Sequence, residues 1–175
     1  ILRFLSNQLP LSAFAALPGI LTLADVFISY SRDDRELVAD IATALESEGL
    51  SVWWDPEILP GTTFDEVIDQ ELDAASCVLV CWSAKSRQSR WVREEAADSL
   101  EREILIPVAI EAVVPPRGFK LVQTEDLDGW QGDRAARAWQ RIMLQARALT
   151  GKVLVETSIE QLEAGAEINL SALST

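Results

Sequence analysis

The stretch Cys77–Trp82 is the feature that most constrains the fold, because its six residues are all apolar. A strand that is apolar on both faces must be covered on both faces, as in the middle of a parallel sheet. Other largely apolar runs at 26–30, 50–54 and 104–110 alternate along the chain with segments of helical apolar spacing. This alternation predicts an α/β domain with a parallel sheet, right-handed crossovers and helices on both faces.

The first expected helix begins with a capping box formed by Asp33 and Glu36 and ends before Gly49. A second capping box, Thr63 with Glu66, opens the next helix, and Ser89 is the expected N-cap of the third. The first helix should turn Leu37, Ile41, Ala44 and Leu45 toward the core. The third helix should turn Val92, Ala96, Ala97 and Leu100 toward the core.

The later part of the domain is less regular. Pro107 predicts an edge position or an irregularity for the fourth strand, since proline cannot donate to a ladder. One short strand is expected near 119–123, followed by a helix over 133–150 with Ala135 and Trp139 inward and Gly151 after it.

These patterns define one domain over residues 25–150. Residues 1–24 form an apolar N-terminal extension, but Pro10 and Pro18 would interrupt a spanning helix, which argues against a membrane segment. Residues 151–175 are a C-terminal extension, with a strand expected at 152–156 and a weak helix at 159–164.

Charge and composition restrict the function. A net charge of −13 argues against binding to nucleic acid or to anionic membranes. Within this acidic chain a local basic patch is formed by Lys85, Arg87, Arg90 and Arg93, as an anionic ligand would need. The absence of histidine removes Ser-His-Asp triads and most zinc sites, so that catalysis would depend on carboxylates.

The two cysteines lie in one expected strand. Cys77 and Cys81 would be about 13 Å apart there, too far for a disulfide. We expect buried thiols in a reducing compartment, which predicts a cytoplasmic protein.

Trp91 and Glu95 form the candidate site, because a spacing of four puts both on one face of a helix. An indole offers a flat wall for a heteroaromatic ring, and a carboxylate stabilises a cation or holds a sugar hydroxyl. The alternative is structural: Ser89 caps the helix and Trp91 packs at the edge of the core. Ser31–Asp34 lacks the glycine that a dinucleotide or phosphate loop requires.

Four motifs in order resemble a Toll/interleukin-1 receptor (TIR) domain of bacterial type. They are Asp25–Ser31, Trp54–Gly61, Val80–Ser83 and Ser89–Glu95. The resemblance implies a flavodoxin-like sheet of five mainly parallel strands. It also implies an NAD+ glycohydrolase that releases nicotinamide and ADP-ribose, or a cyclic form of it, as an immune or toxin effector activated by self-assembly. NAD+ is then the substrate, and no cofactor or metal is expected.

The resemblance also implies residue roles. Glu95 is the catalytic group, and Glu94, about 100° away on the helix, is the weaker candidate. Trp91 and Ser89 border the substrate, Arg32 meets the pyrophosphate with Lys85 or Arg90 as further candidates, and Tyr30 and Trp54 form walls or pack. The assembly loop contains Asp55, Ile58, Pro60 and Gly61. Its Asp55-Pro56-Glu57 segment departs from the family pattern, in which many relatives carry a basic residue near the acid.

Two other interpretations stay open. A noncatalytic TIR module would bind other TIR domains as an adaptor, and Trp91 and Glu95 would then be structural. For the enzyme and for the module alike, the resemblance implies binding to other TIR domains in a homo-oligomer or filament. A generic flavodoxin-like domain would bind another anionic nucleotide. Substituting Glu95 separates the enzyme from the module.

Overall fold

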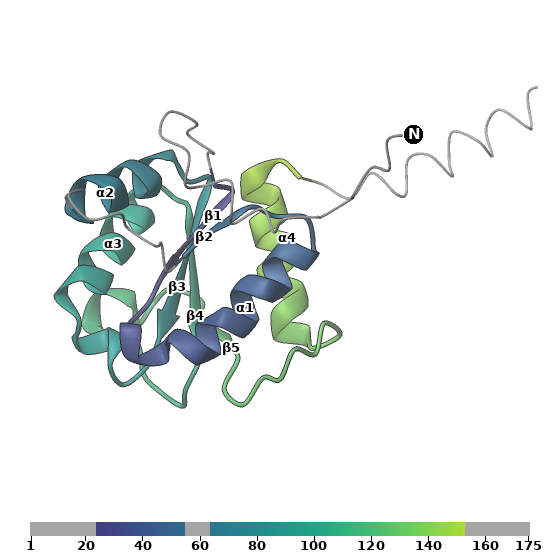
Figure 1. Cartoon of the computed structure of the whole chain (residues 1–175). Helices are drawn as coiled ribbons and strands as arrows, with labels where there is room; N and C mark the ends of the chain where they lie inside the picture. The colour runs from purple at the N-terminus through teal and green to yellow at the C-terminus, as the bar shows by residue number, and fades with distance from the viewer. Residues whose placement is uncertain (1–23, 55–63, 153–175) are drawn as a thin grey trace, which may run out of the picture.

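The fold is a five-stranded sheet in which every pair of neighbouring strands is parallel, with the order β2-β1-β3-β4-β5 (Figure 1). The computed structural model describes residues 24–54 and 64–152. The strands are β1 (Val26–Ser29), β2 (Val52–Trp53), β3 (Cys77–Trp82), β4 (Leu105–Ala109) and β5 (Glu125–Asp126). β3 is central and all six of its residues are buried, as the apolar run predicted.

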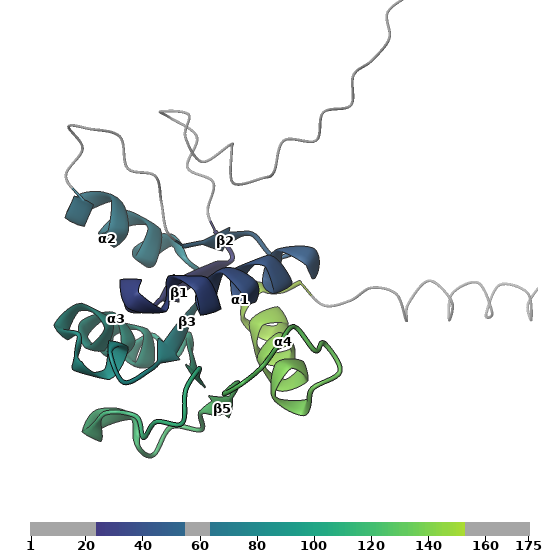
Figure 2. The same ribbon diagram turned by 60° about the horizontal axis from the view of Figure 1, so that its bottom comes forward.

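In the described part of the chain, four α-helices cover the two faces of the sheet (Figure 2). They are α1 (Arg35–Ser47), α2 (Phe64–Ala74), α3 (Arg90–Glu101) and α4 (Arg137–Thr150). Alternate residues of β1 divide between two cores: Val26 and Ile28 pack with α1 and α4, and Phe27 packs with α2 and α3. The flavodoxin-like arrangement expected from the sequence is therefore confirmed.

The start of α1 differs from the prediction. Asp33 lies in a 3-10 turn, Arg32–Asp34, and the α1 N-cap is Asp34, whose side chain makes no capping hydrogen bond. The capping box of Asp33 and Glu36 is wrong because this turn delays the helix. Leu37 is also 47% exposed, not inward. The C-terminal end of α1 is as predicted, since Gly49 follows it with a left-handed φ of +86°.

In α3 the buried stripe is narrower than predicted. Val92, Ala96 and Ser99 are buried, whereas Ala97 and Leu100 are exposed. The positions 92, 96 and 99 follow helical spacing, and each exposed residue lies one position beyond a buried one, turned by about 100°. The predicted N-cap is present, because the Ser89 side chain accepts a hydrogen bond from the Val92 N–H.

Pro107 is not at an edge, because β4 lies between β3 and β5. The backbone shows why proline is tolerated. The Ile110 N–H donates to β3, whereas the Ala109 carbonyl accepts from Leu127 beyond β5. By alternation, the nitrogen of Pro107 faces the β5 side, where pairing begins only at Val108. The missing N–H therefore costs no ladder hydrogen bond.

The segment before α4 also corrects the prediction. Residues 119–123 contain no strand, and β5 lies slightly later, where buried Glu125 accepts hydrogen bonds from Arg141 of α4. α4 begins at Arg137, because the Asp133 carboxylate accepts from the Ala135 N–H and forms a turn that leaves Ala135 exposed. The buried Trp139 and the left-handed Gly151 are as predicted.

Both cysteines are free and buried, as predicted from their place in β3. Among residues 24–54 and 64–152, no helix has the length and apolar character needed to cross a membrane. The Thr63–Glu66 capping box, the assembly loop, residues 1–23 and the expected elements after Lys152 lie outside the described residues.

Candidate functional site

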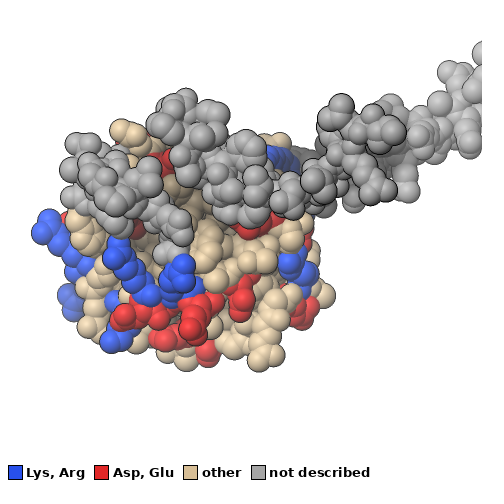
Figure 3. Space-filling view, in the orientation of Figure 1, with Lys and Arg blue, Asp and Glu red and all other residues tan. Residues whose placement is uncertain are grey.

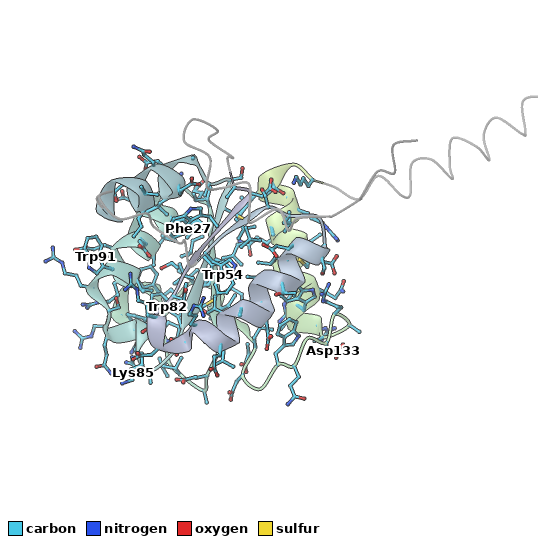
Figure 4. All side chains as sticks on the ribbon, in the orientation of Figure 1. Phe27, Trp54, Trp82, Lys85, Trp91 and Asp133 are labelled. Atoms are coloured by element: carbon cyan, nitrogen blue, oxygen red, sulfur yellow. The ribbon has the colours of Figure 1, made fainter. Side chains whose placement is uncertain are left out.

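The candidate site lies where β1 and β3 end and α3 begins. Ligands of open parallel sheets bind beyond the carboxyl ends of the strands. Ser29 is the last residue of β1, and Trp82 is the last of β3. Figure 4 labels Trp82, Lys85 and Trp91, which come from β3, the following loop and α3.

Glu95 is the half-buried carboxylate of this site. Its Oε2 accepts a 2.5 Å hydrogen bond from the hydroxyl of buried Ser29. Burial raises the pKa of Glu95, the nearby negative charge of Asp69 raises it further, and the Ser29 hydrogen bond opposes both effects. The adjacent Glu94 is exposed and receives a hydrogen bond from Arg90 at 2.7 Å. The two glutamates therefore have different environments, as the helical geometry implied.

Trp91 shares α3 with Glu95 but is 58% exposed, whereas Glu95 turns in toward β1. Figure 4 places the Trp91 ring at the outer side of α3. The other five tryptophans are buried or half-buried. Packing at the edge of the core therefore does not describe Trp91, and its indole face is available to a ligand or a partner.

Tyr30 and Trp54 lie on the other face of the sheet from Glu95. Their ring centroids are 6.4 Å apart, and both rings pack against the core under α1 and α4. The Arg35 guanidinium lies 6.0 Å from the Trp54 centroid. This geometry favours the packing role that the sequence left open for both aromatics, and does not bring them to Glu95.

The basic residues surround the start of α3. Figure 3 shows Lys and Arg gathered on that side of the molecule. Lys85, Arg87, Arg90 and Arg93 are all exposed, and Lys85 lies 3.8 Å from the carboxylate of Asp33. Arg32 is also exposed, in the turn after β1. Ser89 uses its hydroxyl to cap α3, which is a structural role.

Sequence reasoning missed a buried network beside the site. The Ser83 hydroxyl donates to Asp34 Oδ2 at 2.6 Å, and the Ser83 N–H donates to Ser86 Oγ at 2.7 Å. Asp34 and Ser83 are 49 residues apart, so only the sheet topology brings them together. The one available signal was that the polar residue Ser83 directly follows the apolar strand β3.

Three comparisons bear on this fold and site. A family model described as TIR domain matches residues 26–143. The chain is 25% identical over 114 residues to a protein of Methanobrevibacter olleyae named probable 2′ cyclic ADP-D-ribose synthase TcpO, covering 62% of this chain and 30% of that protein. It is 32% identical over 82 residues to 2′ cyclic ADP-D-ribose synthase BtTIR of Bacteroides thetaiotaomicron. That match covers 46% of this chain and 29% of that protein.

The chain thus spans under a third of the length of these curated relatives. A solved structure, the TIR domain of the Toll-related receptor TRR-2 from Hydra magnipapillata, has a TM-score of 0.61 at 21% identity. That match covers 71% of this chain and 98% of the receptor domain, which shows the same fold. Since the family model covers well over half of the sequence, the chain belongs to the TIR domain family.

Proposed function

We propose that this chain cleaves the bond between nicotinamide and ribose in NAD+, with Glu95 as the catalytic carboxylate. The observation that carries the proposal is the position of Glu95, half-buried at the carboxyl end of β1 and bonded to Ser29. Ligands of parallel α/β sheets bind at this edge. The names of the two curated relatives support a product related to cyclic ADP-ribose.

The chemistry suits a site without histidine. When the C1′–N bond breaks, its electron pair passes to the pyridinium nitrogen, and nicotinamide leaves as a neutral molecule without a general acid. The ribose develops oxocarbenium character, which the Glu95 carboxylate stabilises while it orients the ribose hydroxyls. Water then adds to C1′ and loses a proton, giving ADP-ribose. Attack on C1′ by a hydroxyl of the same molecule, which loses its proton as the new C–O bond forms, gives a cyclic product. No cofactor or metal enters this scheme.

The surrounding residues receive supporting roles in the proposal. The exposed indole of Trp91 provides a face for the nicotinamide ring. Lys85, Arg90 and Arg32 are exposed cations around the same edge and would meet the pyrophosphate. The structure gives no support to Tyr30 and Trp54 as walls, because they pack on the opposite face of the sheet.

The test is nicotinamide release from NAD+ at high protein concentration by the parent, Glu95→Gln and Glu94→Gln. We expect the parent and Glu94→Gln to be active, and Glu95→Gln to lose about 100-fold or more. Glu94→Gln is the matched control because it removes a neighbouring exposed carboxylate from the same helix. Equal turnover by Glu95→Gln and the parent would disprove the role of Glu95.

The alternative function is a noncatalytic module that binds other TIR domains. The exposed Trp91 beside exposed arginines favours it, because tryptophan and arginine are enriched in protein interfaces. If the parent releases no nicotinamide even when clustered, and Trp91→Ala weakens self-association in sedimentation velocity, the module is the better description.

The two functions are combined if the enzyme is active only as a homo-oligomer or filament, which we also propose. Turnover should then rise faster than linearly with protein concentration. Strict proportionality over a wide concentration range would contradict a role for self-association in catalysis.

A further inference from the structure

We infer that Asp34 and Ser83 are positioning residues, whose mutual hydrogen bond fixes the start of α3 and thereby the place of Glu95. The inference rests on the function proposed above. It assigns no contact with substrate to either residue, and its evidence is the geometry of the loop between β3 and α3.

Ser83 is the centre of this loop and is fully buried. Its Oγ donates to Asp34 Oδ2 at 2.6 Å and accepts from the N–H groups of Lys85 at 3.1 Å and Ser86 at 2.9 Å. The Ser83 N–H donates to Ser86 Oγ. The Ser83 hydroxyl therefore organises the turn, and Asp34 orients that hydroxyl by accepting its hydrogen bond.

The turn is directly connected to the helix that carries Glu95. The N–H of Ser89 donates to the carbonyl of Ser86 at 3.0 Å, and the Ser89 side chain caps α3. The β1–α1 segment thus holds α3 at two points: Ser29 bonds Glu95, and Asp34 bonds the loop before the helix. Loss of the second contact removes the buried hydrogen bond between this segment and the loop before α3. The exposed ion pair of Asp33 and Lys85, 3.8 Å apart, joins the same two segments at the surface and is worth little by comparison.

The carboxylate of Asp34 makes this contact stronger than a neutral pair would. A hydroxyl-to-carboxylate bond of 2.6 Å has the length typical of a charge-assisted hydrogen bond. Asp34 is only 6% exposed, and burial raises its pKa, although the Ser83 bond opposes that effect. An asparagine keeps an acceptor oxygen but loses the charge, so Asp34→Asn should be milder than Asp34→Ala.

The chain contains a matched control at the amino ends of the strands, opposite the candidate site. Asp25 Oδ2 accepts a hydrogen bond from the Ser51 hydroxyl at 2.7 Å, where β1 and β2 begin. Ser51→Ala therefore removes the same kind of bond from the same sheet, away from α3. Any effect found in both Ser83→Ala and Ser51→Ala reflects general destabilisation.

The experiment measures amide hydrogen exchange over residues 83–95 and kcat for nicotinamide release in the 175-residue chain. Ser83→Ala and Asp34→Ala should lose exchange protection there and about tenfold or more in kcat, with KM nearly unchanged. Asp34→Asn should retain more of both, and Ser51→Ala should resemble the parent. Should Asp34→Ala fail to fold, Ser83→Ala still decides the question.

Unchanged exchange in Ser83→Ala and Asp34→Ala would overturn the inference. A second result would also overturn it: Asp34→Asn and Asp34→Ala lose exchange protection and kcat equally, while Ser83→Ala behaves like the parent. The charge of Asp34 would then act without the hydrogen bond to Ser83. Exchange is measured without turnover, so a parent that releases no nicotinamide refutes only the proposed function.

Discussion

The hydroxyl of Ser29 donates a 2.5 Å hydrogen bond to the carboxylate of Glu95, which lies 66 residues later in the chain. This contact joins the end of β1 to the inner side of α3. It stabilises the ionised form of a group that burial and Asp69 both push toward the protonated form. Burial is the largest effect, so the pKa of Glu95 is above the ordinary glutamate value of 4.5.

Removing the Ser29 hydroxyl should raise the pKa of Glu95 further, because the ionised carboxylate loses its donor. If the ionised form is the active one, the acid limb of the kcat profile moves to higher pH in Ser29→Ala. Ser99→Ala is the control, since the Ser99 hydroxyl donates to the backbone carbonyl of Glu95 and not to its carboxylate. A limb at the parent pH in Ser29→Ala would contradict the prediction.

Asp69→Asn should have the opposite effect. Asp69 is exposed on α2, and its negative charge raises the pKa of Glu95. Without that charge the acid limb moves to lower pH, and the difference from the parent should shrink as salt is added. Asp73→Asn, an exposed acid of the same helix, is the control. A shift of equal size at high and low salt would show that direct electrostatics is not the cause.

Glu95→Gln should unfold at an equal or higher temperature than the parent at pH 7. A carboxyl group whose pKa is raised by folding binds more protons in the folded state between its unfolded and folded pKa values, so stability falls as pH rises through that window. At pH 7 the charged Glu95 therefore costs stability, and neutral glutamine removes the cost. Calorimetry of both proteins at pH 7 provides the measurement, and a clearly lower melting temperature for Glu95→Gln contradicts this account.

The sheet and its covering helices could be predicted because apolar periodicity is a local signal. The six apolar residues of β3 predicted its central place, and the spacing of Val92 and Ala96 predicted the buried side of α3. Predictions that failed depended on details outside the periodicity. The cap predicted at Asp33 failed because a 3-10 turn before a helix has no distinct sequence pattern. The edge position, one of two alternatives that Pro107 indicated, failed because strand order is not a local property.

The candidate site was predictable only in part. The spacing of Trp91 and Glu95 identified two residues of one helix. That Trp91 is exposed whereas Glu95 is half-buried depends on how α3 lies on β1. Ser29 and Asp34 form hydrogen bonds to residues distant in the sequence, and Asp69 acts on Glu95 through its charge from another helix. Local patterns in one amino-acid sequence contain no information on which distant residues lie close together in the fold.

Trp91→Ala should impair substrate binding without affecting the fold. Trp91 is 58% exposed, so little packing is lost, whereas stacking of an aromatic ring on a base contributes about 1–3 kcal/mol. We expect KM for NAD+ to rise by about fivefold or more. The control is Trp82→Ala, because Trp82 is fully buried and its removal should cost about 3–5 kcal/mol of unfolding free energy. An unchanged KM for NAD+ in Trp91→Ala would show that Trp91 does not bind the substrate.

Lys152→Ala should lower the unfolding free energy at pH 7 by up to about 1 kcal/mol, since the lysine is half exposed. Lys152 donates to Asp25 at 2.6 Å and to the Gly49 carbonyl at 3.1 Å. Burial alone raises the pKa of Asp25, but hydrogen bonds from Lys152 and Ser51 outweigh it and hold the pKa below 3.8.

The stabilisation is therefore fully present above pH 3.8 and is lost as pH falls through the lowered pKa of folded Asp25. Denaturant unfolding of Lys152→Ala and the parent at pH 7 and well below pH 3.8 measures this loss, with Lys120→Ala as an exposed-lysine control. The difference between the two proteins should shrink at the acid pH, because protonated Asp25 no longer attracts the ammonium group. A constant difference at both pH values would mean that Lys152 stabilises the domain through the Gly49 carbonyl or through packing, and not through the charge of Asp25.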